Sequence, residues 1–200
     1  MLLTASSAHQ PRFVTENLTV IYNPEISQAF YGELNGNPEY FQINSGKEFN
    51  LYLGILVPDT KNIEKDVSLK LNNEIILNGL NFTWTYFFEE FAGDNYYKGP
   101  EFEQITGAGI YNIEVFSPDN SGKYVLVVGK KEEFPPDEML NALVLMPALK
   151  VFFEKSPLTA YFNLVGAFTF VPIIILIALI VIIFVWKQKS GKQKKKINKK

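Results

Sequence analysis

Short runs of alternating apolar and polar residues fill most of the first 130 residues. In one of them Phe49, Leu51 and Leu53 fall on one face, with Asn50 and Tyr52 on the other. This two-residue period is that of a half-buried β-strand. We predict nine strands, over residues 19–22, 28–34, 40–44, 49–57, 67–71, 74–77, 82–88, 110–117 and 123–128.

The stretches between these runs are rich in turn-forming residues. They include residues 35–38 (NGNP), 44–46 (NSG), 72–73 (NN) and 117–122 (SPDNSG). Glycine and asparagine tolerate left-handed backbone, and proline fixes φ, so such clusters interrupt strands. Many short strands at this spacing predict a mainly β fold. We expect a β-sandwich of jelly-roll or immunoglobulin-like type over residues 9–131.

The pattern changes near residue 134. Pro136, Asp137 and Glu138 are typical of a helix start, and residues 139–153 are then apolar except for Asn141, Pro147 and Lys150. Fifteen helical residues reach only about 22 Å, which is too short to cross a bilayer. We predict a membrane-proximal amphipathic helical segment over residues 132–156 that lies in the membrane interface or packs under the sandwich. Pro147 should kink or split it.

A second apolar run is long enough to cross a membrane. From Leu164 to Trp186 there is no charged residue, and a helix of that length rises about 34 Å. Eight lysines and no acid follow, beginning with Lys187 and Lys189. Lysines prefer the cytoplasmic side of a span, so residues 157–186 are predicted as a single transmembrane helix and residues 187–200 as a cytoplasmic tail. The part of the chain that precedes the span is then on the extracytoplasmic side of the cell membrane.

The lysine tail conceals an acidic outer part. Of the 19 basic residues 11 remain outside the tail, against all 21 acidic residues, which gives 11 − 21 = −10. Such a charge disfavours nucleic acid as a partner and leaves proteins or glycans besides the membrane. The chain has no cysteine, which excludes disulfides and thiol chemistry. Residues 1–8 are either the end of a signal peptide, with Ser6 and Ala8 spaced for cleavage, or a flexible terminus.

Aromatic and acidic residues concentrate between residues 82 and 103. Phe82, Trp84 and Tyr86 alternate onto one face, and acids follow in a predicted loop. One interpretation is a binding surface, because flat rings stack on sugars and carboxylates hold hydroxyls or calcium. The other is that the three rings face the core and the remaining ones fix the loop. The candidate binding residues are Tyr96, Tyr97, Glu89, Glu90 and Asp94.

Two kinds of metal site are conceivable. His9, if it becomes the first residue after cleavage, could chelate copper through its amine and imidazole; otherwise it is a polar residue of a terminal arm. Asp94 and Asp119 are candidates for calcium, which is the possible cofactor of the chain. We predict no enzyme, because His9 is the only histidine and lies outside the predicted strands, and paired carboxylates need a spatial separation that the sequence does not give.

Residues 109–113 read GIYNI and residues 122–126 read GKYVL. This segment, up to residue 128, resembles the closing hairpin of bacterial pre-peptidase C-terminal (PPC) domains, which reads G-x-Y-x-V and then G-x-Y-x-L. The resemblance covers about a tenth of the chain. It implies a non-catalytic jelly roll, often stabilised by calcium and sometimes binding polysaccharide or collagen. A membrane anchor without an attached protease departs from that family, and the wider layout resembles microbial single-pass membrane proteins of similar length.

Two functions are consistent with these features. The first is a membrane-anchored extracytoplasmic binding or interaction module, such as an accessory subunit of a surface complex. The alternative is a metal-handling surface protein, with calcium in the acidic aromatic loop or copper at His9.

Overall fold

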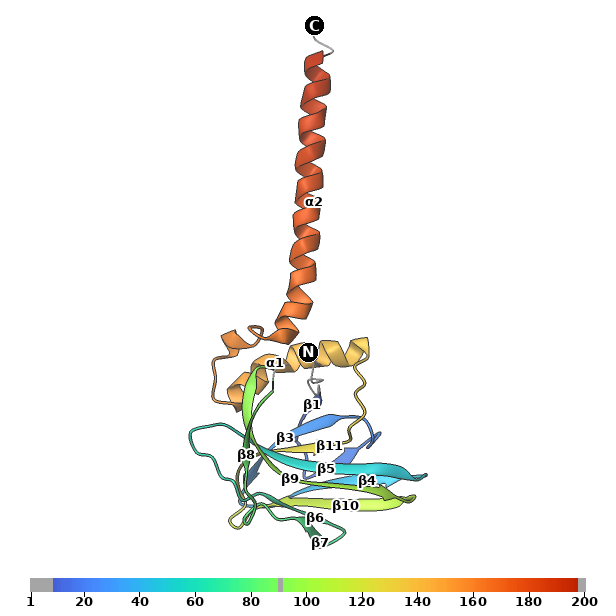
Figure 1. Ribbon diagram of the computed structural model, residues 1–200, viewed down its shortest axis with the longest axis vertical. Helices are drawn as coiled ribbons and strands as arrows, with labels where there is room; N and C mark the ends of the chain where they lie inside the picture. The colour runs from blue at the N-terminus through green and yellow to red at the C-terminus, as the bar shows by residue number, and fades with distance from the viewer. Residues whose placement is uncertain (1–8, 90–91, 198–200) are drawn as a thin grey trace.

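The computed structural model describes residues 9–89 and 92–197 and consists of two stacked sheets, a helix across one of them and a long C-terminal helix (Figure 1). Sheet A has the order β1 (Gln10–Phe13), β3 (Gln28–Asn35), β11 (Ser121–Val128), β5 (Phe49–Pro58), β9 (Asp94–Thr106) and β8 (Thr85–Glu89). Sheet B has the order β2 (Leu18–Ile21), β4 (Glu39–Ser45), β10 (Gly109–Phe116), β6 (Ser68–Leu71) and β7 (Glu74–Leu77). The predicted mainly β sandwich is confirmed.

Both sheets are mixed. Strand β1 pairs with β3, and β2 with β4, in parallel, whereas the other neighbours are antiparallel. Strands β10 and β11 belong to opposite sheets. Residues 109–128 are therefore a connection between sheets and not the hairpin that the sequence suggested. Asn120 closes the turn between them. Its backbone is left-handed, with φ 51°, and its side-chain oxygen Oδ1 accepts a hydrogen bond from the Ser117 N–H at 3.3 Å.

The sequence missed two strands. One is the short β1, and the other is the thirteen-residue β9, which lies where a loop was predicted. Gly99, Pro100 and several charges break the alternation of β9, but long pairing with both β5 and β8 holds it in the sheet. Gly99 is required there, because a Cβ atom would lie 2.5 Å from the Trp84 ring. Strand β8 begins only at Thr85, three residues later than expected.

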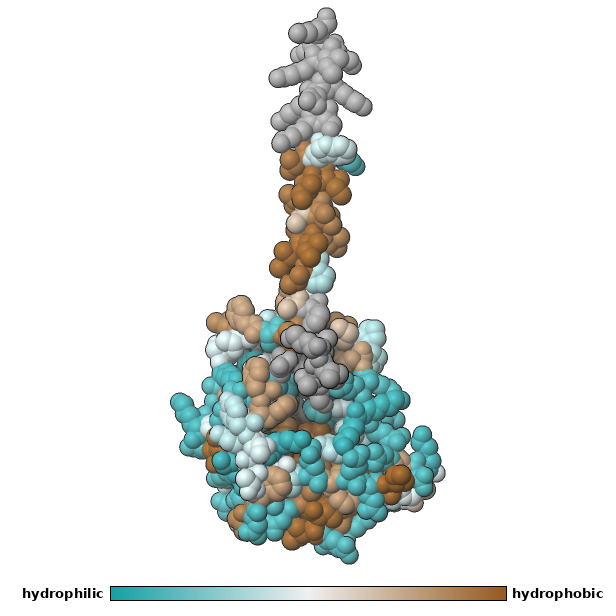
Figure 2. All heavy atoms as spheres, in the orientation of Figure 1, coloured by the Kyte–Doolittle hydropathy of each residue, from teal (hydrophilic) through white to brown (hydrophobic). Residues whose placement is uncertain are grey.

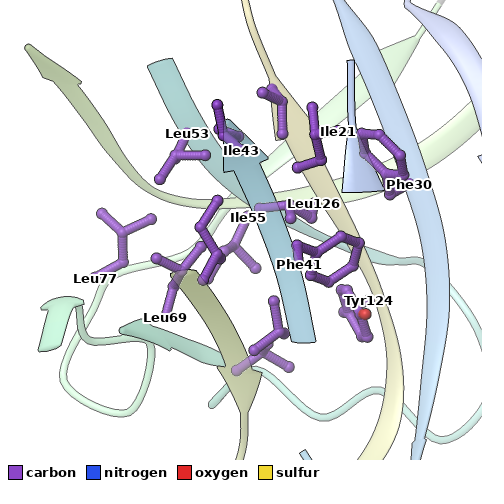
Figure 3. Close-up of a cluster of buried hydrophobic side chains, with 14 of the residues drawn as sticks. Ile21, Phe30, Phe41, Ile43, Leu53, Ile55, Leu69, Leu77, Tyr124 and Leu126 are labelled. Carbon is purple, nitrogen blue, oxygen red and sulfur yellow. The ribbon is translucent and has the colours of Figure 1, made fainter. Parts of the chain in front are cut away.

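The main core lies between the two sheets (Figure 3). Alternate residues of each strand point into it, as the two-residue period requires. Its largest fully buried members are Tyr124, Phe41, Leu34, Ile43, Leu51, Leu53, Ile55, Leu69, Ile113 and Leu126. Trp84 packs against this core, but Phe82 and Tyr86 are exposed. The interpretation that all three rings face the core is therefore correct only for Trp84.

Helix α1 (Pro136–Phe152) lies across the outer face of sheet A. Its residues Met146 and Leu149, followed by Phe153, form a second buried cluster with Tyr31 and Val127 of the sheet. The predicted segment thus packs on the sandwich. The predicted split at Pro147 does not occur, since α1 runs through this residue as one helix.

Tyr161 explains why Pro147 is tolerated. Proline lacks the N–H that would bond the carbonyl four residues earlier, which here is that of Leu143. The Tyr161 hydroxyl donates to the Leu143 carbonyl instead, at 3.0 Å. The freed backbone acceptor is satisfied, and the helix continues.

Helix α2 (Leu164–Ile197) follows a short 3₁₀ helix, η1 (Pro157–Thr159). It extends away from the sandwich, and Figure 2 shows its apolar residues on the outside. The stretch Thr169–Lys187 has 19 residues, a mean hydropathy of 3.1 and no buried residue. This helix is long and apolar enough to span a membrane.

Candidate functional site

The predicted binding residues lie on the β8–β9 hairpin. Asp94 and Tyr96 are buried, so the expectation that they belong to an exposed loop is wrong. Tyr97 is partly buried under Lys65, whose Nζ is 4.2 Å from the ring centre. The Glu89 carboxylate accepts the Ala92 N–H at 2.7 Å, and Glu90 lies outside the described residues. The described residues on either side of the hairpin end are thus packed against their surroundings.

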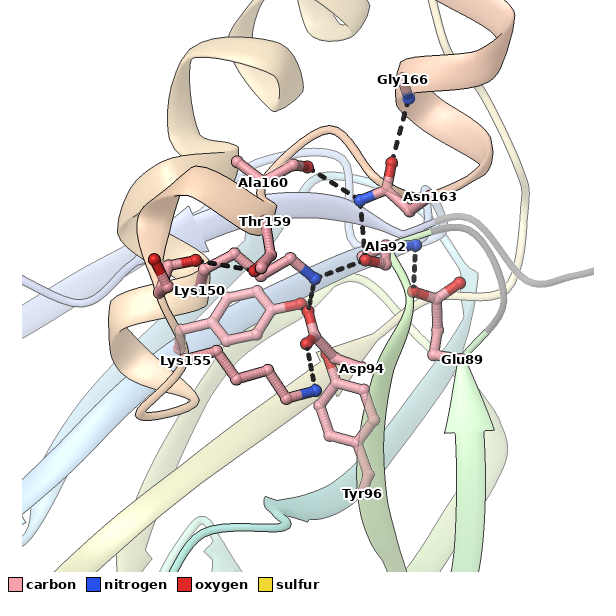
Figure 4. A network of polar contacts seen from close by, with 12 residues as sticks. Glu89, Ala92, Asp94, Tyr96, Lys150, Lys155, Thr159, Ala160, Asn163 and Gly166 are labelled. Carbon is pink, nitrogen blue, oxygen red and sulfur yellow. Dashed lines mark hydrogen bonds and ion pairs between the residues drawn. The ribbon is translucent and has the colours of Figure 1, made fainter.

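Asp94 is the centre of a buried ionic network (Figure 4). Its carboxylate accepts from Lys150 Nζ at 2.7 Å and from Lys155 Nζ at 2.8 Å. The side chains of Asp94 and Lys150 are 1% and 3% exposed. Lys150 also donates to the Ala92 carbonyl at 2.6 Å. Since both carboxylate oxygens are occupied by protein cations, Asp94 here joins the sheet to the helical segment.

The end of α1 brings both lysines to the same carboxylate. The Lys155 N–H bonds to the Lys150 carbonyl at 2.8 Å, and the Glu154 N–H bonds to that of Val151 at 2.9 Å. This pair of bonds is a Schellman motif, with Glu154 in the left-handed conformation at φ 56°. The motif turns the chain back within five residues. Lys150 and Lys155, which it joins, therefore converge on Asp94.

Asn163 fixes the start of α2 to the same hairpin. Its carbonyl oxygen Oδ1 accepts the Gly166 N–H at 3.0 Å, which is N-terminal capping of the helix. Its amide donates to the carbonyls of Ala92 at 2.8 Å and Ala160 at 2.9 Å. The Ala92 carbonyl thus receives both Lys150 and Asn163. We call Ala92, Asp94, Lys150, Lys155 and Asn163 the junction.

Few sequence patterns indicate that the residues of the junction meet. Lys150 is the one charged residue of residues 139–153, and a lone charge on an apolar helix signals a buried partner. The partner, Asp94, is 56 residues away, and its role depends on a strand pairing that was not predicted. Asn163 preceding an apolar run is a recognisable N-cap. Its second role toward Ala92 has no sequence pattern.

Two tyrosines extend the junction under α1. The hydroxyls of Tyr31 and Tyr96 lie 3.1 Å apart, and the Tyr96 ring packs edge-on against Phe153 with centres 4.9 Å apart. Burial is the main cause that raises the pKa of both phenols well above the usual range. Both hydroxyls therefore stay neutral at physiological pH and act as a hydrogen-bonded part of the packing.

His9 also lies under α1, where its Nδ1 contacts the Ser27 hydroxyl. It lines a cavity of about 40 Å³ together with Tyr31, Glu89 and Tyr96. Burial lowers the pKa of His9 to about 4, so the imidazole is neutral at pH 7. A cavity of this size accommodates water-sized molecules.

The other metal candidates are dispersed. Asp119 lies in the turn before β11, where its carboxylate accepts the Ser121 N–H at 3.3 Å and contacts the Ser117 and Ser121 hydroxyls. Hydrogen bonds from Ser121 are the main cause that lowers the Asp119 pKa. Among residues 9–89 and 92–197, no group of three or more histidine, aspartate and glutamate side chains is arranged to hold a metal ion.

Comparisons with known proteins give a limited picture. No protein-family model and no curated protein matches the sequence. Several solved structures are similar in part. The pre-peptidase C-terminal domain of a Bacillus anthracis collagenase is 14% identical over 57% of this chain and 96% of that one, with a TM-score of 0.35. A β-glucosidase from Kluyveromyces marxianus is 16% identical over 55% of this chain and 13% of that one, with a TM-score of 0.31.

A third is the catalytic domain of a GH87 α-1,3-glucanase. It is 14% identical over 54% of this chain and 23% of that one, with a TM-score of 0.27. The structural class of this chain therefore follows from its own topology and not from these comparisons. It is a two-sheet β-sandwich carrying a C-terminal helix that is long and apolar enough to span a membrane.

The junction should depend on Asp94. Replacing it by asparagine (Asp94→Asn) leaves the buried Lys150 ammonium without a counter-charge, which we expect to lower the free energy of unfolding by about 3–5 kcal/mol. The double variant Asp94→Leu/Lys150→Met removes both buried charges and should recover part of that loss. Urea unfolding of the full chain in detergent, followed by Trp84 fluorescence, measures both.

The matched control for this change is Glu103→Gln. It breaks the exposed Lys130–Glu103 pair and should leave the free energy of unfolding nearly unchanged, because solvent screens this pair. A loss below about 1 kcal/mol for Asp94→Asn would show that the junction is not held by this charge pair.

The buried His9 predicts a pH dependence of stability. Its folded pKa of about 4 lies below the ordinary value of 6.5, so the unfolded chain binds more protons between these values. Stability should therefore be fully present above about pH 6.5 and fall by about 3 kcal/mol as the pH is lowered to 4. In His9→Asn this component should be absent. Parallel urea titrations at pH 7 and pH 4 test it, and equal pH dependence in both proteins would contradict it.

Proposed function

We propose that this chain is a single-pass membrane protein whose β-sandwich is held outside the cytoplasm as a binding or interaction module. The observation that carries the proposal is the stretch Thr169–Lys187, which is apolar and without a buried residue, and which leads directly from the junction. An apolar helix of this length has no stable place in water. A bilayer is the environment in which its side chains are satisfied.

The charges on the two sides of α2 support the orientation. Eight lysines follow Trp186, whereas the lysines shortly before the span are Lys150 and Lys155, and both are paired with Asp94. Positive charge is retained on the cytoplasmic side of a membrane. The tail is accordingly proposed to be cytoplasmic, and the acidic, cysteine-free sandwich extracytoplasmic.

The face proposed for partner binding is the outer face of sheet B. Helix α1 covers much of the outer face of sheet A, whereas sheet B lies on the far side of the sandwich from α2 (Figure 1). Sheet B exposes an apolar set on that face, made of Leu18, Val20, Tyr40, Ile75 and Ile110. These apolar residues are interspersed with polar ones such as Gln42 and Glu114, and a mixed surface of this kind is typical of protein contacts that form in water. The partner we propose is another protein of the same membrane surface, which makes this chain an accessory subunit.

The proposal includes a relationship of the sandwich to jelly-roll domains of the PPC type. Residues 109–128 resemble the end of PPC domains in sequence, although β10 and β11 lie in opposite sheets, and such domains are non-catalytic modules. We accordingly propose that the sandwich acts by binding and not by catalysis.

Topology can be measured by single cysteines, because the natural chain has none. We expect Asn62→Cys, in the exposed loop between β5 and β6, to react with a membrane-impermeant maleimide in intact cells. Ser190→Cys, in the tail, should react only after permeabilisation. Mass shifts on gels report both reactions. The reverse pattern, or reaction of both in intact cells, would contradict the proposed orientation.

The binding face is tested by a photo-crosslinking amino acid at Ile110. We expect a discrete higher-mass adduct in native membranes, because this side chain lies in the exposed apolar set of sheet B. Ile105 of β9, an exposed isoleucine on sheet A, is the matched control and should give no such adduct. An unmodified monomer at both positions, or equal adducts at both, would count against sheet B as the binding face.

A further inference from the structure

Helix α1 presents an apolar stripe on the side opposite to the sheet. Leu140, Val144 and Val151 are 64%, 76% and 58% exposed, and Ala148 lies between them. Their spacing of four, four and three residues places them on one face of the helix. A helix facing water carries charged residues on this face, but the stripe has none. We call these four residues the α1 stripe.

The base of α2 continues this apolar surface. Leu158 in η1 and Phe162 just before α2 are each 85% exposed, the highest values among the large apolar side chains that the structure describes. Figure 2 shows apolar residues around the base of α2, on the side of the sandwich from which that helix leaves. Tyr161 lies beside them, with its ring against Phe170 at 5.3 Å between centres. The surface is therefore continuous with the start of the proposed span.

The junction fixes the position of this surface relative to α2. Lys150 and Lys155 hold the end of α1 on Asp94, and Asn163 holds the first turn of α2 on Ala92. In Figure 1, α1 runs across the base of α2, as a helix lying along a membrane plane would. Sheet A is on the other side of α1. The surface consequently faces the same direction as the span.

The length of the span determines how deep the apolar residues before α2 lie in the bilayer. The charge-free run from Leu164 to Trp186 rises about 34 Å, a few Å more than a hydrocarbon core of roughly 30 Å, and its most apolar stretch begins at Thr169. The boundary of that core therefore falls in the first two turns of α2. Phe162 lies two residues before this helix. It lies close to this boundary, in the headgroup region where aromatic side chains and amphipathic helices settle.

We infer that the α1 stripe, Leu158 and Phe162 lie in the interface of the bilayer that α2 crosses. The occupant of this apolar surface is lipid, at the level of the headgroups and upper acyl chains. The sandwich is then held flat on the membrane, with sheet A toward it and the outer face of sheet B directed away. This inference rests on the proposed anchoring by α2 and adds the orientation of the whole extracytoplasmic part.

Single cysteines carrying an environment-sensitive fluorophore test this in the full chain, reconstituted as one copy per nanodisc. The probes are placed at Val144→Cys and Phe162→Cys. Leu176→Cys in the span reports anchoring, and Ile75→Cys on β7 is the exposed apolar control. The four positions are exposed, so unchanged circular dichroism is expected. Nitroxide groups on the lipid chains, near the headgroup or in the middle of the bilayer, quench probes at their depth, and aqueous iodide quenches probes in water.

The inference expects about twofold quenching at Val144 and Phe162 by the shallow nitroxide and protection from iodide. Leu176 should respond to the deep nitroxide, and Ile75 only to iodide. If Leu176 is quenched by lipid while Val144 and Phe162 respond to iodide, the inference is overturned and the membrane anchor stands. The surface would then be open to a protein partner. Loss of lipid quenching at Leu176 itself would overturn the proposed anchor.

Discussion

The buried charge of Lys150 is the constraint on which the arrangement of the helical part depends. An ammonium group under a helix is stable only when an opposite charge and hydrogen-bond acceptors meet it, because desolvation costs several kcal/mol. Asp94 and the Ala92 carbonyl supply both, at 2.7 and 2.6 Å. They come from the end of one hairpin, so α1 can close over sheet A only with its last turn at that point. A purely apolar contact would allow it to slide.

The same point also determines where α2 begins. The Schellman motif returns the chain to Asp94 through Lys155, and η1 then leads to Asn163, whose amide reaches the Ala92 carbonyl already used by Lys150. Gly166 permits this approach, since a Cβ atom there would lie 1.9 Å from the Tyr161 carbonyl oxygen. Sandwich, α1 and α2 thus share one anchoring point. A flexible linker would leave the sandwich free to rotate on its helix, whereas this contact fixes its orientation.

Local patterns were enough to predict some features of the fold and not others. Alternation in β5 and the turn residues predicted the sandwich, and the charge-free run predicted α2, because these features depend on neighbouring residues. Strand β9 was missed since its order comes from pairing with β5 and β8. Tyr96 and Asp94 were expected at the surface for the same reason, and Pro147 was expected to break α1 because Tyr161 could not be placed. The junction joins residues 56 apart or more, which periodicity does not reveal.

The distribution of apolar side chains separates the two faces of the sandwich. On sheet A the apolar cluster around Tyr31 and Val127 is covered by α1, which then presents an apolar stripe of its own away from the sheet. Covering sheet A with α1 thus leaves a new apolar surface exposed on the outer side of the helix. Contact with another apolar phase removes this surface from water. On sheet B no helix intervenes, and the exposed set around Ile110 alternates with paired polar groups such as Gln42–Asn112 and Lys70–Glu114. A mixed surface of this kind suits a protein contact that forms in water, whereas the uniformly apolar stripe suits lipid.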